Sequence, residues 1–552
     1  MKNWKITIGK ILALGLGTGL LLCGCGQETT QDTENLNYAE VTFPIQEDVT
    51  LRIWADNTHM VVKNLQDMGC YQEISKKTGV KFEIISPVAG QSEEQFNVMI
   101  ASQEYPDIIE GVSYRYKGGL EKAWSDQVIL ELSDLTERCA PNLTKLYETY
   151  PQLKMEASNA DGQMFAVPMI RGGNILRTYT GPVVRADYLE KFNLEIPETI
   201  EDWHTMLTVF KENGISYPFT AVGSTFRGYS SFIGAWNTCP GFFNDNGKVF
   251  YGPYEEGYKE YVKTMAQWYQ EGLIDSEITT NDQKIADSKI MANGAGAFIG
   301  TSGNSVGGYL QQMASKDPEF DLQPVPYPVL NEGEKNRFIQ RDAVAQTSVG
   351  ASITTTAEHP DIAMAVLDYG FSKDGHMAYN FGVEGESYEM IDGYPTYTDL
   401  VMHNPDGLAV SKAGSLYARA FTSGPFVQDA KYGEQFYSME RQKEASEMWT
   451  KDLDAYNANP SVVRGSLTPE QTDEIASMQN EITTYVSEMF AKWLMGREDP
   501  ETGFAAYQEQ LRSMGLEKIL SYYQEAQDRY LEAYPEMSQA QDAEISDYFW
   551  QD

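Results

Sequence analysis

Residues 49–54 read VTLRIW, an alternation of apolar and polar side chains that is typical of a β-strand. A helical pattern follows at 65–74, and a second alternation occupies 80–84. Residues 96–100 have the spacing of another helix, and PDII at 106–109 has the composition of a short buried strand. This βαβαβ order predicts a parallel sheet joined by right-handed crossovers, and therefore an α/β fold for the start of the folded chain.

The loops that follow the strands are the expected place for a ligand, because such sheets bind beyond the carboxyl ends of their strands. These ends carry WADN at 54–57 and EGVSY at 110–114. We therefore expect Asp56, Asn57 and Tyr114 to face a ligand.

The later sequence is increasingly helical. TIED at 199–202 is a capping-box variant before an apolar stripe, and residues 258–268 place their aromatic side chains on one helical face. TPEQ at 468–471 combines an N-cap, a proline in the first turn and a glutamine box partner, which predicts the start of a long helix. Two shorter helices are expected at about 502–514 and 516–533.

Composition and charge exclude several classes of partner and site. The 552 residues include 42 Lys and Arg against 80 Asp and Glu, a formal net charge of −38, which repels nucleic acid and anionic lipid headgroups. The length predicts at least two domains. Five cysteines are too few for a disulfide-stapled scaffold or a multi-cysteine zinc site. Aromatic residues reach 12%, which suits a groove that is half apolar and half wet.

The first 25 residues indicate export. Three lysines precede the apolar run 11–22, which as a helix would rise about 18 Å and is too short to span a bilayer. The run ends LCGC at 22–25, which resembles the bacterial lipobox. We expect residues 1–24 to be a lipoprotein signal peptide and Cys25 to carry diacylglycerol; a plain secretory signal is the alternative.

Residues 25–48 are expected to form a disordered acidic tether. They contain no Lys or Arg and few apolar side chains, so they cannot bury enough surface to fold. An acidic spacer is repelled by an anionic membrane and extends away from it. Anchor and spacer together predict an extracellular protein at the outer face of the cytoplasmic membrane.

Catalytic motifs are missing from the sequence. No two of the histidines at 59, 204, 359, 376 and 403 have the helical spacing of metal ligands, and there is no Gly-x-Ser-x-Gly elbow. The glycine-rich run at 294–300 misses the dinucleotide fingerprint by one residue, and we interpret it as a tight strand-to-loop turn. With 80 acids, carboxylate pairs suited to glycoside hydrolysis occur by chance, so no motif favours an enzyme.

Several motifs occur from residue 161 onward. They are DGQMFAVP at 161–168, RADYLEK at 185–191 with IPET at 196–199, YGP at 251–253 with YQEGLID at 269–275, NFGVEG at 380–385 with DGYP at 392–395, and MGL at 514–516 before 522–530. Together these motifs resemble those of the extracellular solute-binding proteins of ABC importers. The subgroup that the chain resembles is the sugar-binding lipoproteins of Gram-positive bacteria called LplA-like, which are related to the alginate-oligosaccharide binders.

This resemblance implies a two-lobe periplasmic-binding-protein-like fold of the α/β class, with crossing hinge strands and a helix-rich C-terminal region. The expected lobes are residues 49–165 plus about 325–400, and residues 166–324 plus about 401–552. The implied function is to capture an oligosaccharide as a monomer and deliver it to the transmembrane subunits of an ABC permease, without chemistry. An extracellular glycoside hydrolase or lyase and a cell-surface glycan adhesin remain the alternatives.

Metals and cofactors are not expected. Relatives often carry a calcium loop before a Pro-Phe pair, but KENGISYPF at 211–219 is short and lacks paired acids in its middle. A calcium ion takes six to eight oxygen ligands, which this stretch does not supply. NDNG at 244–247 is interpreted as a plain turn.

The remaining candidate ligand residues lie at strand ends or between the expected lobes. A neutral sugar presents apolar C–H faces and a ring of hydroxyls, so its binder needs aromatic platforms flanked by donors and acceptors. Trp236, in a mixed aromatic and polar stretch, is the expected stacking platform. The other candidates are Arg171 after the 161–168 motif, Thr301 and Ser302 after the glycine-rich run, Arg341 and Asp342 before a strand-like segment, and Glu384 and Tyr388 near the EG motif.

Overall fold

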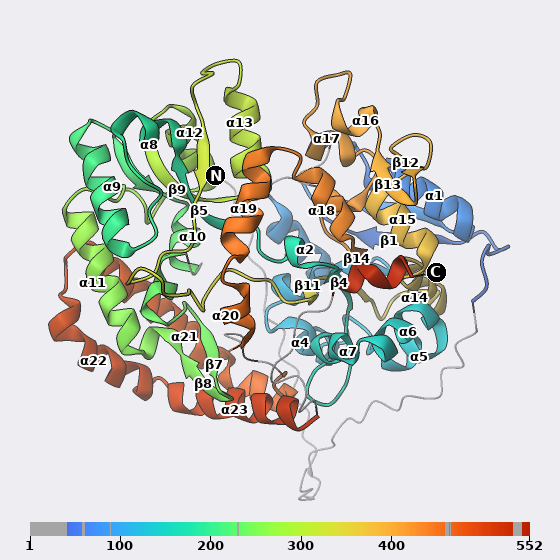
Figure 1. The fold of residues 1–552 in the computed structure, drawn as a ribbon. Helices are drawn as coiled ribbons and strands as arrows, with labels where there is room; N and C mark the ends of the chain where they lie inside the picture. Colours follow the sequence, from blue (N-terminus) through green and yellow to red (C-terminus); the bar gives the residue numbers. More distant parts are fainter. Residues whose placement is uncertain are drawn as a thin grey trace, which may run out of the picture. The chain divides into compact units, whose positions relative to one another are not determined.

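The computed structural model describes residues 41–57, 61–88, 90–228, 231–458, 463, 465–533 and 544–551 (Figure 1). All elements below belong to one unit, Ala39–Asp552. The expected signal peptide, Cys25 and the expected tether up to residue 40 lie outside the described residues. In the part of the chain that is described, no helix combines the length and the apolar character that a bilayer crossing requires.

The predicted βαβαβ unit forms the core of a six-stranded sheet. β1 (Thr50–Trp54) pairs in parallel with β2 (Lys81–Ile85) and with β3 (Ile108–Glu110), and α1 (Gly69–Thr78) and α2 (Ser92–Ser102) connect them. The parallel pairing and the two crossover helices confirm the prediction from sequence.

Three later strands complete this sheet, in the order β14-β4-β11-β3-β1-β2. β11 (Ala345–Ile353) is antiparallel to β3 and to β4 (Val167–Arg171), and β14 (Val427–Gln428) is parallel to β4. β4 lies past residue 165 and β14 past residue 400, so both differ from the lobe limits that we expected. The reason is that neither feature can be recognised in the local sequence. β14 is only two residues long, and β4 is paired with β11, which lies far away in the chain.

Helices cover the first sheet. Asp368 on one of them, α14, accepts hydrogen bonds from the Leu143 N–H at 2.8 Å and the Asn142 amide at 2.7 Å, and so ties α14 to α6. The helices and short turns are α3 (Val112–Arg115), α4 (Gly119–Ser125), α5 (Ser133–Cys139), α6 (Pro141–Thr149), α7 (Pro151–Ala157), α14 (Pro360–Tyr369), α15 (Lys373–Phe381), α16 (Asp399–Met402), α17 (Val410–Gly414), η6 (Arg419–Phe421), α18 (Ala430–Phe436) and η8 (Ile545–Phe549), with the hairpin β12 (Tyr388–Ile391) and β13 (Tyr394–Tyr397).

The second sheet has four strands in the order β10-β5-β9-β6. β5 (Thr180–Arg185) is antiparallel to β9 (Ala295–Thr301) and to β10 (Leu322–Pro324), and β6 (Tyr217–Thr220) is parallel to β9. The glycine-rich run is therefore a buried strand rather than the turn that we expected. Its glycines serve packing, because a Cβ at Gly296 would overlap the ring of Phe210.

A helix-rich layer packs against the second sheet. α9 (Ile200–Glu212) begins with the capping box expected at Thr199, whose side chain accepts the Asp202 N–H at 3.1 Å. Figure 1 shows α11 (Glu256–Gln270) beside α21 (Pro469–Leu494) and α22 (Pro500–Ser513), followed by α23 (Leu516–Ala533). The further elements are α8 (Ala186–Phe192), α10 (Gly223–Gly228), η3 (Ile233–Trp236), α12 (Gln283–Met291), η5 (Ser302–Gly307), α13 (Gly308–Met313), α19 (Glu440–Thr450), α20 (Leu453–Ala458) and the hairpin β7 (Phe242–Asp245) and β8 (Lys248–Tyr251).

The two turns that bear on metal binding are short. The chain passes from α9 to β6 through Asn213–Ser216, with Gly214 at φ 82°. At 244–247, the expected turn joins β7 to β8, with positive φ at Asn246 and Gly247. Among the described residues, no group of three or more His, Cys, Asp or Glu side chains is arranged to hold a metal ion.

The last residues of the expected tether are attached to the first lobe. The Phe43 ring contacts Tyr369 with centroids 5.9 Å apart, and the Ile45 N–H donates to the Thr78 carbonyl at 2.8 Å. Lys81 and Asp48 form an ion pair at 2.6 Å. Residues 43–48 thus contact the folded body through a ring contact, a backbone hydrogen bond and an ion pair, so the expected disorder does not extend to residue 48.

Candidate functional site

Two segments of the chain pass from one sheet to the other and lie against each other. The first runs from β4 to β5 through residues 172–179, and the second from β10 to β11 through residues 325–344. The Arg177 Nε donates to the Asp342 carbonyl at 2.8 Å, and the Tyr179 hydroxyl donates to Asp342 Oδ2 at 3.1 Å. These crossing segments are the structural counterpart of the hinge strands that the sequence predicted.

A pocket of about 220 Å³ lies at these crossings, and we call it the hinge pocket. Its lining combines both sheets: Arg171 and Gln428 come from the first, and Thr301 comes from the end of β9 in the second. The rest of the lining is drawn from residues 176–179, 302–304 and 411–437. A molecule bound here would touch both lobes and the segment that joins them.

Arg171 is held across the pocket wall by side chains distant in sequence. Its Nη1 donates to Gln428 Oε1 at 2.5 Å, and its Nη2 lies 3.5 Å from Asp342 Oδ2. The guanidinium also lies 5.7 Å from the centroid of the Tyr179 ring. These contacts fix the orientation of the guanidinium and partly balance its charge.

Two buried polar atoms of the lining have no hydrogen-bond partner within the described part of the chain: Arg171 Nε and the Ser302 hydroxyl. Buried polar groups are almost always hydrogen-bonded, because an unsatisfied one costs about 1–3 kcal/mol. Arg171 ends β4 of the first sheet, and Ser302 directly follows β9 of the second sheet. Both residues belong to the lining of the hinge pocket.

Aromatic rings from the region after β13 form the remaining wall. Tyr432 and Phe436 are stacked at 5.5 Å with 10° between their planes, and Phe421 meets Tyr432 edge to face at 4.9 Å. Burial raises the pKa of Tyr432 well above its ordinary value, so its hydroxyl stays neutral. Flat apolar rings beside unsatisfied polar atoms form the surface that a sugar ring requires.

Arg171, Thr301 and Ser302 are brought together in the hinge pocket. Asp342 lies beside them as the partner of Arg171, and Arg341 lies on the second crossing segment, where its Nη1 donates to Thr178 Oγ1 at 3.2 Å. Five of the expected residues thus gather at the crossings. Their part in binding stays a prediction.

Asp56, Asn57 and Tyr114 lie together at the edge of the first sheet and do not line the hinge pocket. Asp56 pairs with Arg115 and accepts the Ser92 hydroxyl at 3.0 Å and the Tyr114 hydroxyl at 3.4 Å. The Asn57 amide donates to the Val62 carbonyl at 3.0 Å, and the Tyr114 side chain is 57% exposed. Asp56 is therefore committed to internal partners, whereas Tyr114 is largely exposed, with the Arg115 guanidinium 4.3 Å from the centroid of its ring.

The other three expected residues lie elsewhere. Trp236 is half-buried in η3, where its ring packs on Tyr261 at 5.7 Å, so the structure places it against the core of the second lobe. Glu384 and Tyr388 line a different pocket, beside α15 and the β12–β13 hairpin. The mixed pattern around Trp236 belongs to a short turn of 3-10 helix. The part of Trp236, Glu384 and Tyr388 in binding stays a prediction.

Sequence reasoning missed most of the aromatic wall. Phe421, Tyr432, Phe436 and Tyr437 all line the hinge pocket, together with Gln428. These residues form no motif, but the sequence does show an unusual number of aromatic residues here. Residues 417–437 contain six aromatic side chains around a Gly-Pro pair.

Comparisons with known proteins agree with this architecture. The chain is 24% identical to the fructooligosaccharide ABC transporter substrate-binding protein FusA of Streptococcus pneumoniae, over 95% of this chain and 98% of that protein. It is 21% identical to the lipoprotein LipO of Bacillus subtilis, over 60% of this chain and 66% of that protein. The solved structure of the alginate-binding protein AlgQ2 without calcium ion superimposes with a TM-score of 0.73 at 25% identity, covering 89% of this chain and all of that one.

The family model for bacterial extracellular solute-binding proteins matches residues 65–377, more than half of the chain. The matched range includes α1, β2, α2 and β3 of the βαβαβ unit, both crossing segments and the strands β4, β5, β9 and β11. The two-lobe α/β fold and the sequence match therefore lead to the same conclusion: this chain belongs to the bacterial extracellular solute-binding proteins.

Proposed function

We propose that this protein captures an oligosaccharide between its two lobes and delivers it to the transmembrane subunits of an ABC importer. The observation that carries the proposal is that one pocket contains Arg171 at the end of β4 and Ser302 just after β9 beside an aromatic wall. The Arg171 Nε and the Ser302 hydroxyl are both buried without a hydrogen bond of normal geometry to the described residues. Hydroxyl groups on a sugar ring would satisfy both atoms. The relatives named for fructooligosaccharide and alginate binding support a carbohydrate as the ligand class.

A ligand held by both sheets favours the closed arrangement of the lobes, because it gains all of its contacts only there. No chemistry is required of the protein in this scheme, and it acts as a monomer. A glycoside hydrolase or lyase would consume its ligand, so chromatography of a glycan mixture before and after incubation separates the two functions. An adhesin would bind without closing, which small-angle scattering with and without ligand would detect.

The direct test is calorimetry with fructooligosaccharides and alginate oligosaccharides. Ser302→Ala should weaken binding by about 0.5–1.5 kcal/mol, the net value of one hydrogen bond. It should change the free energy of unfolding only slightly, because the hydroxyl makes no hydrogen bond of normal geometry within the described residues, although it lies near enough to Tyr437 to oppose the rise that burial causes in the pKa of that tyrosine. Ser352→Ala is the matched control: Ser352 is also buried without a partner, but it lies on β11 away from the pocket.

Phe436→Ala provides a second variant, with Phe250→Ala, a half-buried aromatic on β8, as its control. Loss of a well-packed aromatic contact typically costs about 1–3 kcal/mol of binding energy. If neither Ser302→Ala nor Phe436→Ala changed the affinity of a sugar that the wild type binds, the hinge pocket would not be the binding site. If no oligosaccharide bound the wild type, the proposed ligand class would be wrong.

We further propose that Cys25 is the lipid attachment site and holds the protein at the outer face of the cytoplasmic membrane. The lipobox-like LCGC at 22–25 supports this, and so does the relative named as a lipoprotein. Two acyl chains on one cysteine meet the requirement for stable anchoring. Cys25→Ala should release the protein into the medium or leave it unprocessed, whereas Cys23→Ala should remain membrane-bound. Mature Cys25→Ala protein in the membrane fraction would contradict this assignment.

A further inference from the structure

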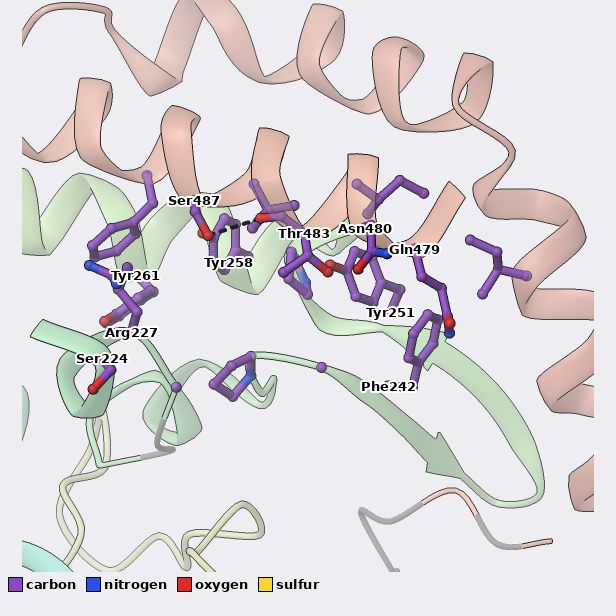
Figure 2. A pocket seen from close by; sticks show the side chains of 18 residues that line it. Ser224, Arg227, Phe242, Tyr251, Tyr258, Tyr261, Gln479, Asn480, Thr483 and Ser487 are labelled. Carbon is purple, nitrogen blue, oxygen red and sulfur yellow. Dashed lines mark hydrogen bonds between the residues drawn. The ribbon is translucent and has the colours of Figure 1, made fainter. Parts of the chain in front are cut away.

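A second pocket, of about 560 Å³, lies within the second lobe, and we call it the aromatic pocket. Figure 2 shows its walls: Ser224 and Arg227 come from α10, Phe242 and Tyr251 from the β7–β8 hairpin, Tyr258 and Tyr261 from α11, and residues 479–487 from α21. Its volume falls in the range of about 300–1,000 Å³ that is usual for small-molecule sites. None of its lining residues is shared with the hinge pocket.

Both pockets lie at the same edge of the second sheet. β6 and β9 are parallel neighbours, with Thr220 paired to Phe298. β6 runs on into α10 with Arg227, and β9 runs on to Thr301 and Ser302 in the hinge pocket. In open α/β sheets, ligands bind beyond the carboxyl ends of the strands. Each pocket is thus lined by residues that follow the carboxyl end of one of these two neighbouring strands.

The rings that line the aromatic pocket hold one another in place. Phe242 stacks on Tyr523 at 4.4 Å and packs on Tyr251 at 4.7 Å, and Tyr261 is stacked on Phe490 at 6.2 Å with 20° between their planes. Rings that are fixed before the ligand arrives lose little conformational entropy when it binds. They can cover the apolar face of a sugar residue.

Three polar groups of the aromatic pocket have no hydrogen-bond partner among the described residues. Tyr258 and Tyr261 are each only 4% exposed, yet their hydroxyls make no hydrogen bond to any residue that the structure describes. Burial raises the pKa of both tyrosines, which keeps these hydroxyls neutral donors. Arg227 is half-buried and has no carboxylate or other acceptor partner among the described residues, in a chain with 80 Asp and Glu.

The upper wall in Figure 2 adds further donors and acceptors. Asn480, Thr483 and Ser487 project from α21 on the side of the tyrosine rings, and the Ser487 hydroxyl donates to the Thr483 carbonyl at 2.9 Å. Fixed rings, neutral hydroxyls and a guanidinium that has no partner in the described part of the chain form a site for a molecule with an apolar face and many oxygen acceptors. A sugar residue has this chemistry.

We infer that the aromatic pocket is a second subsite, which binds a sugar residue of the oligosaccharide whose other end occupies the hinge pocket. This inference rests on the proposed function, since it assumes an oligosaccharide in the hinge pocket. Its consequence is selection by length. A short oligosaccharide binds in the hinge pocket alone. A longer one gains additional affinity from Arg227, Tyr258 and Tyr261 in the aromatic pocket.

The test is calorimetric titration of a ladder of chain lengths, taken from the fructooligosaccharide or alginate series that the wild type binds. Ser487→Trp places a large side chain into the pocket from an exposed position, so it should not disturb the core. Ser477→Trp is the matched control, because Ser477 is equally exposed on α21 and does not line the pocket. Arg227→Met removes the guanidinium while keeping an unbranched side chain.

We expect Ser487→Trp and Arg227→Met to weaken binding of the longest sugars by about tenfold or more, equivalent to about 1.4 kcal/mol. The shortest sugar that binds should stay within about twofold of wild type, and Ser477→Trp should match wild type at every length. The inference would be overturned if both pocket variants bound every chain length as tightly as wild type does. It would also be overturned if they lost the same factor of affinity at every length. If the wild type bound no sugar at all, the proposed function itself would fail.

Discussion

Arg419 offers a sharp test of how the first lobe is held together beneath the edge that carries Asp56 and Tyr114. Its side chain is 1% exposed, and its Nη2 donates to Glu110 Oε2 at 2.8 Å. Its Nη1 donates to the Tyr71 hydroxyl at 2.9 Å, and its Nε to the Ser423 carbonyl at 2.7 Å. Replacing it with methionine keeps an unbranched apolar side chain and removes the charge and all of these donors.

The magnitude follows from what Arg419→Met leaves behind. The Glu110 side chain is only 11% exposed, and removing one partner of a buried ion pair typically costs about 3–5 kcal/mol. The Tyr71 hydroxyl and the Ser423 carbonyl also lose a partner, which places Arg419→Met at the upper end of that range. In the double variant Arg419→Met/Glu110→Gln the uncompensated charge is gone, so we expect at least about 2 kcal/mol to be recovered.

The pH dependence has a defined sign. Burial raises the pKa of Glu110, and the Arg419 guanidinium opposes that rise. Without Arg419 the folded-state pKa rises further above the unfolded value, so the folded state binds a proton that the unfolded state releases. Stability of Arg419→Met should therefore fall as the pH increases through the folded pKa, and its deficit against wild type should be larger at pH 8 than at pH 5.

Urea unfolding followed by circular dichroism, at both pH values, measures all of these quantities. Arg138→Met is the control, because the Arg138–Asp134 pair at 3.1 Å is exposed and should contribute no more than about 0.5 kcal/mol. The reasoning would be refuted if Arg419→Met stayed within about 1 kcal/mol of wild type. It would also be refuted if the double variant were as unstable as Arg419→Met alone.

Three further predictions concern pH, packing and metal. Burial raises the pKa of Asp368 to about 6 from 3.8. The wild type should therefore lose up to about 3 kcal/mol of stability between pH 4 and pH 7. Urea unfolding of Asp368→Asn should not show this loss. Gly296→Ala should cost about 1–3 kcal/mol in urea unfolding, because the new methyl group overlaps the Phe210 ring, and Phe210→Leu in the same chain should recover part of it. EDTA should leave the melting temperature unchanged, because the connection at 211–219 is a short turn; a fall of many degrees would show that a bound metal contributes to the fold.

Elements with local signals could be predicted from the sequence. The alternation of apolar and polar residues at 49–54 and 80–84 predicted the two strands that the structure shows in parallel. This prediction was possible because the same alternation determines both the strand conformation and which side chains are buried. The capping boxes at Thr199 and Thr468 located the starts of α9 and α21, since each box satisfies its own backbone donors within a few residues.

Elements that depend on distant partners could not be predicted. β14 is two residues long and exists because β4 lies beside it, and Arg171 meets Gln428 across 257 positions of sequence. The aromatic wall of the hinge pocket was missed for the same reason. Trp236 was predicted as a stacking platform because its neighbours lack a helical period. The structure places that irregularity in a 3-10 turn, where Trp236 packs on Tyr261, and its role in binding stays a prediction.

The two pockets differ in the charge that they present, and this difference suggests how selectivity is divided between them. Arg171 in the hinge pocket already has Gln428 and Asp342 as partners, so a ligand there need supply only neutral oxygen acceptors. Arg227 in the aromatic pocket has no such partner among the described residues, so a ligand gains more there from a carboxylate or a dense set of hydroxyls. We therefore expect the hinge pocket to determine whether a sugar is bound and the lobes close, and the aromatic pocket to determine which chain length and which substituents are preferred. Because a ligand shifts the closed state only by its differential affinity for that state, contacts confined to the second lobe would add affinity without adding closure.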